Sequence, residues 1–372
     1  MEKRNKIRVL QVFGSLNCGG AECRMMDIYR HIDRSVYQFD FVSLLQEQQF
    51  FEEEIQSLGG HVLKLHSPRE CGILRHISEL RECIREGDYQ AVHAHTSYHC
   101  GLAMLAAKLE GVPVRISHAR TTGSKRKGIL KSIFFHIGRT LINRCSTVRF
   151  AISKNAGNFL FGKHQFEVVP NAIDMETYQN ITADEIKQLK REIKITEDQF
   201  VIGQIGRFDS MKNHRFTVQW FAQFSALHPE AVLVLIGDGK LRNEIETLAR
   251  DLRVDDKIIF TGVRNDVPHL IHVLNVLIFP SLFEGLGGVA LEAQAAGIPC
   301  VESDAIPEEA DLHLGLVKQV SLQAPMEEWN SRIEESRKIQ IPDNLEIKNA
   351  FAAAGYSIEA VTDRYLNAYR GS

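Results

Sequence analysis

Short apolar runs alternate with longer amphipathic stretches along most of the chain. The runs are rich in β-branched and aromatic residues, and the stretches between them repeat apolar positions with the period of a helix. This alternation predicts an α/β fold built on parallel sheets. Strands are predicted at 7–13, 39–45, 61–65, 89–94, 114–117, 150–153 and 168–171, and again at 201–205, 233–237, 258–261 and 276–279. Helices are predicted at 50–58, 72–86, 241–252 and 289–296.

The length of the chain sets the expected number of domains. At 372 residues the chain exceeds what one hydrophobic core ordinarily serves, so two domains of about 170–190 residues are expected. The composition, 44% hydrophobic and 24% charged, is typical of a soluble globular protein.

The stretch 276–303 has the strongest local pattern. It predicts a buried strand, a turn with three glycines, a helix and a second strand. Glu284 lies in the turn and Glu292 in the helix, near the carboxyl end of the strand, where open α/β sheets bind ligands. The helix start directs free amides to that edge, which suits a phosphate. Two interpretations stay open on chemistry alone: a ligand with hydroxyls and phosphates, or an ordinary glycine turn followed by a solvent-facing Glu292.

A second glycine loop follows the predicted strand 201–205. It contains Arg207 and Lys212, five positions apart. Two fixed positive charges can stabilise a departing diphosphate, on which negative charge grows as its bond to a sugar breaks. This spacing is common in proteins and by itself does not indicate a diphosphate site. Its position after a strand and a glycine makes such a site a better interpretation.

The first strand is also followed by a glycine loop, which ends in Gly19 and Gly20. The loop lacks the G-x-G-x-x-G pattern, so a nicotinamide cofactor is not expected, and a plain tight turn explains the spacing equally well. Histidines stand at the ends of two later strands. His93 and His95 are at the end of the strand 89–94, and His118 directly follows the strand 114–117. Such residues can act as acids, bases or sugar ligands, but most single histidines do not. For His93, His95 and His99 both interpretations stay open.

Positive charge is concentrated in the first half. Residues 1–170 contain 24 Lys and Arg against 16 Asp and Glu, a net +8, whereas residues 171–372 contain 20 against 31, a net −11. The basic half is therefore expected to meet an anionic partner.

The segment 125–144 combines a basic cluster with an amphipathic helix. Its apolar stripe either rests on an anionic membrane or packs on the sheet. The basic cluster consists of Lys125, Arg126 and Lys127; the stripe of Ile129, Leu130, Ile133, Phe134, Ile137 and Leu141; and the opposite face of Lys131, His136 and Arg139.

Cysteines and apolar runs bear on the compartment. Seven cysteines without a C-x-x-C pair favour neither a disulfide framework nor a zinc site, and indicate a reducing cytosol. The amino terminus lacks the apolar core of a signal peptide, and no apolar run of 18 residues occurs. A cytoplasmic protein is expected, peripheral on the inner face of the membrane if the basic segment contacts lipid.

The segment SLFEGLGGVALEAQAAGIPCV resembles the signature of the family 4 retaining glycosyltransferases of GT-B fold. The resemblance implies two Rossmann-like domains facing a cleft, with Glu284 at the donor sugar and Glu292 at the nucleotide ribose. Family members often carry a proline after the E-G pair, which this chain lacks. The turn and helix start would contribute the donor-binding positions Gly287, Gly288 and Val289.

Other segments carry the same resemblance. Arg207 and Lys212 match the family motif G-R-x(4)-K, whose cations bind the donor diphosphate, and His118 in PVRISHAR would lie near the donor sugar. The segment 303–309 resembles a continuation found in capsule and exopolysaccharide glycosyltransferases. Residues expected at the reacting centre are His118, Arg207, Lys212 and Glu284. Further donor-binding positions implied by the family are Gly19, Gly20, Val263 and Arg264.

The string PNAIDMETY resembles the passage between the two domains of this family. A linker is therefore expected at 172–196, within a division into an acceptor-binding domain at 1–171 and a nucleotide-sugar-binding domain at 172–355. The last segment, 356–372, contains a predicted helix at 358–369, which in GT-B proteins returns to the first domain.

The resemblance implies transfer of a hexose-type sugar from a nucleotide sugar, expected to be a UDP-sugar, to a lipid-linked or saccharide acceptor with retention of configuration. No D-x-D triplet occurs, so neither a metal ion nor a cofactor is expected. An anionic membrane surface is a candidate partner, and nucleic acid is not. The alternatives are a UDP-sugar epimerase of the same fold, a phosphorylase, for which no cofactor-bearing lysine is identified, and a non-catalytic nucleotide-sugar-binding partner.

Overall fold

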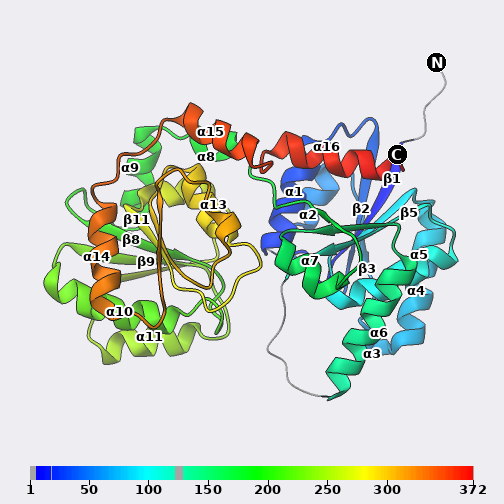
Figure 1. Ribbon diagram of the computed structural model, residues 1–372, viewed down its shortest axis with the longest axis horizontal. Coiled ribbons are helices and arrows are strands. Elements are labelled where there is room, and N and C mark those ends of the chain that lie inside the picture. The colour runs from blue at the N-terminus through cyan, green and yellow to red at the C-terminus, as the bar shows by residue number, and fades with distance from the viewer. Residues whose placement is uncertain (1–5, 18, 122–128, 372) are drawn as a thin grey trace. The chain divides into compact units, whose positions relative to one another are not determined.

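The computed structural model describes residues 6–17, 19–121 and 129–371, with the backbone alone at 129–131. The chain forms two compact units. Unit 1 consists of residues 1–172 together with 358–372, and unit 2 consists of residues 173–357. Each unit is an α/β domain built on one parallel sheet (Figure 1). The expected class, two Rossmann-like domains, is confirmed.

Unit 1 contains a seven-stranded sheet in the order β3-β2-β1-β4-β5-β6-β7. Its central strands are mostly apolar and largely buried, as a parallel sheet covered by helices on both faces requires. The strands are β1 (Ile7–Val12), β2 (Tyr37–Ser43), β3 (Val62–Lys64), β4 (Ala91–Ala94), β5 (Val114–Ala119), β6 (Val148–Ala151) and β7 (Glu167–Val168). The helices are α1 (Gly20–His31), α2 (Glu52–Ser57), α3 (Pro68–Cys71), α4 (Ile73–Gly87), α5 (Cys100–Leu109), α6 (Ile129–Cys145), α7 (Lys154–Phe161) and α16 (Ile358–Tyr369).

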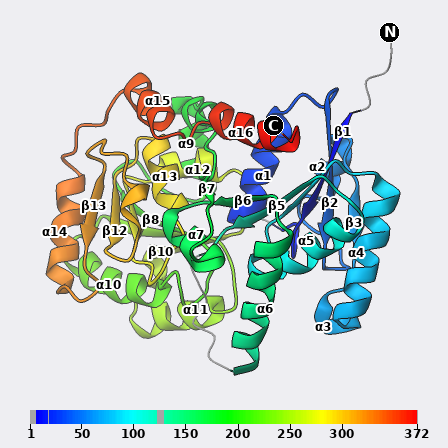
Figure 2. The same ribbon diagram turned by 45° about the vertical axis from the view of Figure 1, so that its right-hand side comes forward.

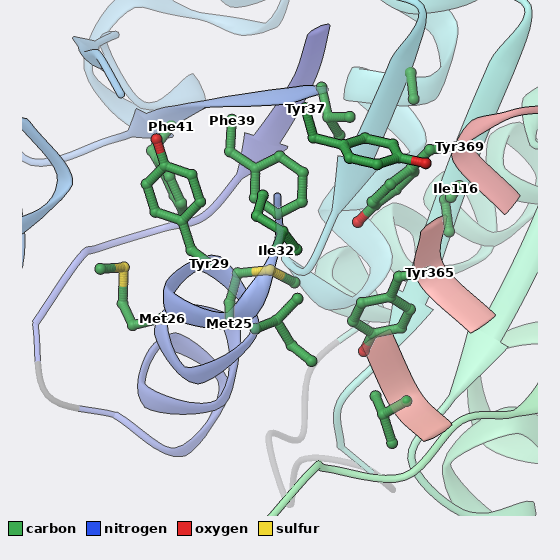
Figure 3. Close-up of a cluster of buried hydrophobic side chains, with 14 of the residues drawn as sticks. Met25, Met26, Tyr29, Ile32, Tyr37, Phe39, Phe41, Ile116, Tyr365 and Tyr369 are labelled. Carbon is green, nitrogen blue, oxygen red and sulfur yellow. The ribbon is translucent and has the colours of Figure 1, made fainter. Parts of the chain in front are cut away.

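Helices cover both faces of this sheet, α1, α2 and α16 on one and α4 and α5 on the other (Figure 2). On the first face, Tyr29 of α1 stacks on Phe39 of β2, with ring centroids 5.3 Å apart. Tyr369 of α16 meets Phe39 edge-on at 5.7 Å. Figure 3 shows Tyr365 and Tyr369 reaching from α16 into the same cluster as Tyr29 and Met25. The last helix of the chain is thus part of the core of unit 1.

Unit 2 contains a six-stranded sheet in the order β10-β9-β8-β11-β12-β13. Trp220 of α10 and Trp329 of α14 are fully buried in its hydrophobic core. The strands are β8 (Phe200–Ile205), β9 (Ala231–Ile236), β10 (Ile258–Gly262), β11 (Val276–Phe279), β12 (Cys300–Ser303) and β13 (Val317–Val320). The helices are α8 (Met175–Gln179), α9 (Ala183–Glu192), α10 (His214–Leu227), α11 (Arg242–Asp251), α12 (Val267–Leu270), α13 (Gly288–Ala295), α14 (Met326–Ser336) and α15 (Asn344–Ala353).

Each sheet has one point at which the strand order reverses direction. In unit 1 this switch point lies between β1 and β4, and in unit 2 it lies between β8 and β11. Loops that leave the carboxyl ends of two such strands diverge to opposite faces, and the crevice between them is where α/β sheets bind ligands. A binding or catalytic site is therefore expected at the loops after β1, β4, β8 and β11.

The predicted strands are all present, with ends shifted by a few residues, and β11 and α16 have the predicted bounds. The predicted linker at 172–196 is wrong, because α8 and α9 form there and belong to unit 2. Thr182 begins α9 with a capping box, accepting from the Glu185 amide while the Glu185 carboxylate accepts from Thr182. A start signal of this kind inside the predicted linker indicated a helix.

Helix α6 leaves three residues of the predicted apolar stripe exposed. Ile133, Phe134 and Ile137 are 48%, 47% and 50% exposed. The face that packs includes Gly138, whose missing side chain leaves room for the Tyr98 carbonyl oxygen, 2.3 Å from where a Cβ atom would stand. Packing of the stripe on the sheet is therefore excluded for these three residues. The basic cluster 125–127 lies outside the described residues.

No helix in the described part of the chain is long and apolar enough to cross a bilayer. The cysteines of that part are all free: Cys23, Cys71, Cys83, Cys100, Cys145 and Cys300.

Candidate active site

The loop after β8, residues 206–213, is fixed by its own polar groups. Asp209 Oδ1 accepts from the backbone amides of Met211 and Lys212 at 2.9 and 3.2 Å. Asn213 adopts a left-handed conformation, φ 55°, and its side-chain amide donates to the Pro280 carbonyl at 3.1 Å. Because Pro280 directly follows β11, this bond joins the two loops of the switch point.

Lys212 and Glu284 meet between these two loops. Lys212 Nζ donates to Glu284 Oε1 at 2.7 Å, and their side chains are 17% and 16% exposed. The same ammonium lies 4.7 Å from the centre of the Phe279 ring, a cation–π contact that orients it further. The structure therefore brings together two of the residues predicted for the reacting centre. The pair offers a positive and a negative group side by side, which suits a ligand with phosphates and hydroxyls.

Arg207 lies in the same loop as Lys212 and is exposed. Among the described residues, none forms a hydrogen bond or an ion pair with its guanidinium group. A solvated guanidinium on a fixed loop can bind an incoming phosphate in a bidentate way without first breaking a protein contact.

Helix α13 starts at the same switch point. Its N-cap residue, Gly287, has φ 94°, and a Cβ atom there would come 2.7 Å from Ile306 and 3.1 Å from Ala310. Only glycine fits this position. Gly288, the first helical residue, has no atom within 4 Å of where its Cβ would stand, so space lies open beside the helix start. The free amides and the positive end of the helix dipole are thus available to an anion.

The remaining predicted donor-binding residues of unit 2 differ in their surroundings. Val289 and Glu292 are half-buried in α13, and Glu292 follows Gly288 by about one helical turn. Val263, in the loop after β10, is 56% exposed. The guanidinium of Arg264 is held by Asp266 and Glu192, with three contacts of 2.6–2.7 Å. The backbone of Arg264, and not its guanidinium group, is therefore available to a ligand.

One buried acid near this site was not predicted from the sequence. Glu302 of β12 is 1% exposed, and its Oε2 has no hydrogen-bond partner among the described residues. Burial raises its pKa to about 8, and the negative charges of Asp311 and Glu284 raise it as well. Glu302 is therefore neutral at pH 7. The signal in the sequence was a single acid inside an otherwise apolar strand, PCVES.

The glycines of the first loop lie at the start of α1. Gly19 is the N-cap residue of this helix, and a Cβ atom there would come 2.5 Å from a carboxylate oxygen of Glu22. Gly20 has open space at its Cβ position. The structure thus places both at a helix start beside β1, in unit 1.

His118 is fully buried in unit 1, next to two other buried histidines. His93 Nε2 lies 3.1 Å from His118 Nδ1, and the ring of His95 lies 4.2 Å from the ring of His93, centre to centre. Burial lowers the pKa of all three well below the usual value. His99 lies apart on the surface, where it packs on Tyr98. His118 Nε2 has no partner among the described residues, so its predicted contact with a donor sugar stays a prediction.

Arg120 is a second residue that the sequence reasoning missed. It directly follows β5, and its guanidinium donates to Asn171 Oδ1 at 2.6 Å and to His95 Nδ1 at 3.2 Å. Asn171 belongs to the string PNAIDMETY, so this bond joins the end of β5 to the end of unit 1. The available signal was a cation two positions after His118.

Two family models match the chain. One, described as Glycosyltransferase Family 4, matches residues 18–177, and the other, described as Glycosyl transferases group 1, matches residues 185–334. EpsF of Bacillus subtilis (strain 168), named as a glycosyltransferase, is 37% identical over 374 residues, which cover 97% of this chain and 96% of EpsF. An Escherichia coli enzyme named as a galactosyltransferase from UDP-Gal to GlcNAc-diphosphoundecaprenol is 26% identical over 62% of each chain.

Solved structures share the fold. HepE of Anabaena, solved with UDP-glucose, superposes with a TM-score of 0.80 at 19% identity and covers 98% of this chain and 100% of HepE. WaaG, a glycosyltransferase of lipopolysaccharide biosynthesis, superposes with a TM-score of 0.75 at 16% identity, covering 98% and 100%. These likenesses show the GT-B fold, with two parallel-sheet domains.

Proposed function

The chain belongs to glycosyltransferase family 4, and we propose that it transfers a hexose from a UDP-sugar to a lipid-linked saccharide, with retention of configuration and without a metal ion. The observation that carries the proposal is the pair of Lys212 and Glu284 at the switch point of unit 2, beside the solvated Arg207. HepE, which shares the fold, was solved with UDP-glucose, and this supports a UDP-sugar as donor.

The cations of the site would stabilise the leaving group. As the bond between the sugar and the diphosphate breaks, negative charge accumulates on the diphosphate oxygens. Arg207, Lys212 and the amides at the start of α13 are the positive groups that the structure gathers at this edge. Together they would supply the charge that a metal ion supplies in metal-dependent transferases.

The acids and the open backbone would hold the rest of the donor. Glu292 would accept hydrogen bonds from the two ribose hydroxyls, and Glu284 from hydroxyls of the sugar, where its contact with Lys212 aligns it. The backbone at Val263 and Arg264 would contact the base. Attack by the acceptor on the face that the diphosphate leaves, with the phosphate receiving the acceptor proton, gives retention without a protein nucleophile.

Two observations support a lipid-linked acceptor. The relative from Escherichia coli is named for transfer to a sugar diphosphoundecaprenol. In this chain, Ile133, Phe134 and Ile137 of α6 are exposed in the half with a net positive charge. An anionic bilayer would attract that half, and the three apolar side chains would be buried in the bilayer interface.

Incubation of the purified protein with radiolabelled UDP-sugars and a membrane extract tests the proposal. Label that moves into the lipid-extractable fraction supports the transferase. A free epimer of the sugar would instead indicate an epimerase, and binding without turnover a non-catalytic partner. The Lys212→Ala variant is the control, because transfer that persists in it does not arise from the proposed site.

A further inference from the structure

Six polar side chains near the carboxyl ends of β1, β4 and β5 form one continuous chain of hydrogen bonds, which we name the relay. In order of contact its members are Arg120, His95, Gln11, Tyr369, His93 and His118. All six belong to unit 1, and Tyr369 comes from the last turn of α16. The relay is internal to the unit and joins the end of the chain to three strands.

The direction of the first bonds follows from Arg120, because a guanidinium group only donates. Its Nε lies 3.2 Å from His95 Nδ1, so this nitrogen must be the unprotonated one. The proton of a neutral His95 is then on Nε2, which donates to Gln11 Oε1 at 3.0 Å. This bond in turn fixes the orientation of the Gln11 amide, whose Nε2 then faces Tyr369.

The donor and the acceptor of each remaining bond follow from the bond before it. Gln11 Nε2 donates to the Tyr369 oxygen at 3.1 Å, so the hydroxyl proton of Tyr369 is free to donate to His93 Nδ1 at 2.8 Å. His93 then carries its proton on Nε2 and donates to His118 Nδ1 at 3.1 Å. His118, accepting at Nδ1, carries its own proton on Nε2.

A side branch leads to the same result. Tyr365 accepts from Arg120 at 3.4 Å, which leaves its hydroxyl proton facing His118 Nδ1, also 3.4 Å away. Two donors therefore converge on His118 Nδ1. The one nitrogen of the three imidazoles that has no partner among the described residues is His118 Nε2, which is buried. The backbone of Val169 also acts on this ring, because a hydrogen bond with it raises the pKa of His118.

A metal ion explains the three histidines less well than the relay does. Their ligand atoms lie within 4.8 Å of one another, as a metal site would require. However, the lone pairs on His95 Nδ1, His93 Nδ1 and His118 Nδ1 already accept hydrogen bonds. The positive charge of Arg120 next to His95 would also repel a cation.

We propose that the relay holds His118 as a neutral imidazole with its proton on Nε2, with Arg120 and Tyr369 as positioning residues. At Nε2, His118 would then offer a hydrogen-bond donor to any bound ligand and would not act as a general base. The tautomer follows from unit 1 alone, and only the identity of the ligand rests on the proposed function.

Nuclear magnetic resonance of the ligand-free full-length protein, labelled with ¹³C and ¹⁵N in histidine, reads the tautomer directly. The His118 signal is assigned by its loss in His118→Gln. We expect a neutral ring protonated on Nε2 that does not titrate near the ordinary histidine pKa of about 6.5. A proton on Nδ1, a charged ring at neutral pH, or stoichiometric zinc in the purified protein would overturn the proposal.

Gln11→Glu tests the direction of the relay. The new carboxylate can still accept from His95, but it cannot donate to Tyr369. The Tyr369 proton then turns toward the carboxylate, His93 must donate to Tyr369 from Nδ1, and the His118 proton moves to Nδ1. Where the carboxyl ¹³C signal shows the new side chain to be ionised, a tautomer unchanged by this nearly isosteric substitution contradicts the relay. A protonated side chain donates to Tyr369 as Gln11 does and should leave the tautomer unchanged.

Tyr369→Phe provides a second variant if the buried carboxylate prevents folding. Its matched control is Tyr37→Phe, because the Tyr37 hydroxyl is buried in the same core without a hydrogen-bond partner among the described residues. Tyr369→Phe should leave His118 in a mixture of tautomers and lower kcat roughly tenfold, as expected for one misplaced hydrogen bond. Tyr37→Phe should change neither. If the wild type shows the predicted tautomer but no transfer from any UDP-sugar, the proposed function fails and the relay stands.

Discussion

Lys212 is the residue on which the candidate site depends most. Its ammonium is held by Glu284 on one side and by the face of Phe279 on another, so it has little freedom to follow a ligand. A charge placed in advance costs no reorganisation when the reaction occurs, and this is the condition under which electrostatic stabilisation of a transition state is greatest. Arg207, by contrast, is solvated and can adjust to the incoming phosphate.

We therefore predict that Arg207→Ala and Lys212→Ala act mainly on turnover. Loss of one donor to a developing negative charge commonly lowers the rate by about 100- to 1000-fold. Initial rates at saturating donor, with circular dichroism to verify folding, would measure this loss. Arg332→Ala is the matched control, since Arg332 is a surface cation of α14 paired with Glu335. Near-normal kcat in both site variants would place the diphosphate elsewhere.

Glu292 is predicted to act on binding. A carboxylate that accepts from two ribose hydroxyls makes charge-assisted bonds of roughly 1.5–3 kcal/mol each, so Glu292→Ala should weaken binding of UDP at least about tenfold. Titration calorimetry with UDP alone measures this, with the exposed Glu327 of α14 changed to Ala as the control. Equal affinities of the wild type and Glu292→Ala would remove Glu292 from the ribose site.

Glu302 gives the protein a pH dependence of stability. Its pKa is raised to about 8 in the folded state, against about 4.3 for an unperturbed Glu, so between these values the folded state binds a proton that the unfolded state has lost. The stability contributed by Glu302 must therefore fall as pH rises through this window. Glu302→Gln, which stays neutral, should flatten the dependence and raise Tm increasingly toward pH 8. Thermal melts of both proteins from pH 5 to about pH 8 test this, and parallel curves would contradict it.

At the scale of elements, α6 shows what an apolar pattern leaves open. The stripe fitted either a packed face or a membrane-bound face, and the helix packs in part through Gly138, which allows the backbone at Tyr98 to approach closely. Periodicity of apolar residues cannot register a contact that is made by the absence of a side chain. Three residues of the stripe, Ile133, Phe134 and Ile137, are left partly exposed.

This exposed face is predicted to bind anionic lipid together with the cluster 125–127. Three basic residues near such a surface contribute about 1 kcal/mol each at low salt, and the apolar side chains add burial in the interface. Flotation with anionic and neutral liposomes should show binding that falls with salt. Replacing Ile133, Phe134 and Ile137 with Ser, or the three basic residues with Ala, should abolish it.

Leu227→Ser is the control for the apolar substitution, because Leu227 is 71% exposed at the end of α10, in the other unit. Flotation that ignores lipid charge, salt and both sets of residues would show that α6 does not contact the membrane. A soluble acceptor would then be the better proposal.

At the scale of the whole molecule, local sequence patterns predicted the segments within each unit, but not the contacts between residues that are far apart in the sequence. The strand, glycine turn and helix at 276–303 were predicted because every step has a strong local signal, and parallel sheets then bring Lys212 and Glu284 to the same edge. The relay could not be predicted, because His93 and Tyr369 are 276 positions apart and neither belongs to a motif. Strand β13, VKQV, was missed because an edge strand needs few apolar residues.

The central claim is that the switch point of unit 2 binds a nucleotide sugar whose glycosyl group is transferred to an acceptor. The most direct measurement is UDP release by the purified protein across a panel of UDP-sugars, with and without a membrane extract that contains acceptors. We predict release from one preferred donor, dependent on the extract and reduced about 100-fold or more in Lys212→Ala. Release from no donor while UDP still binds, or release that Lys212→Ala leaves unchanged, would contradict it.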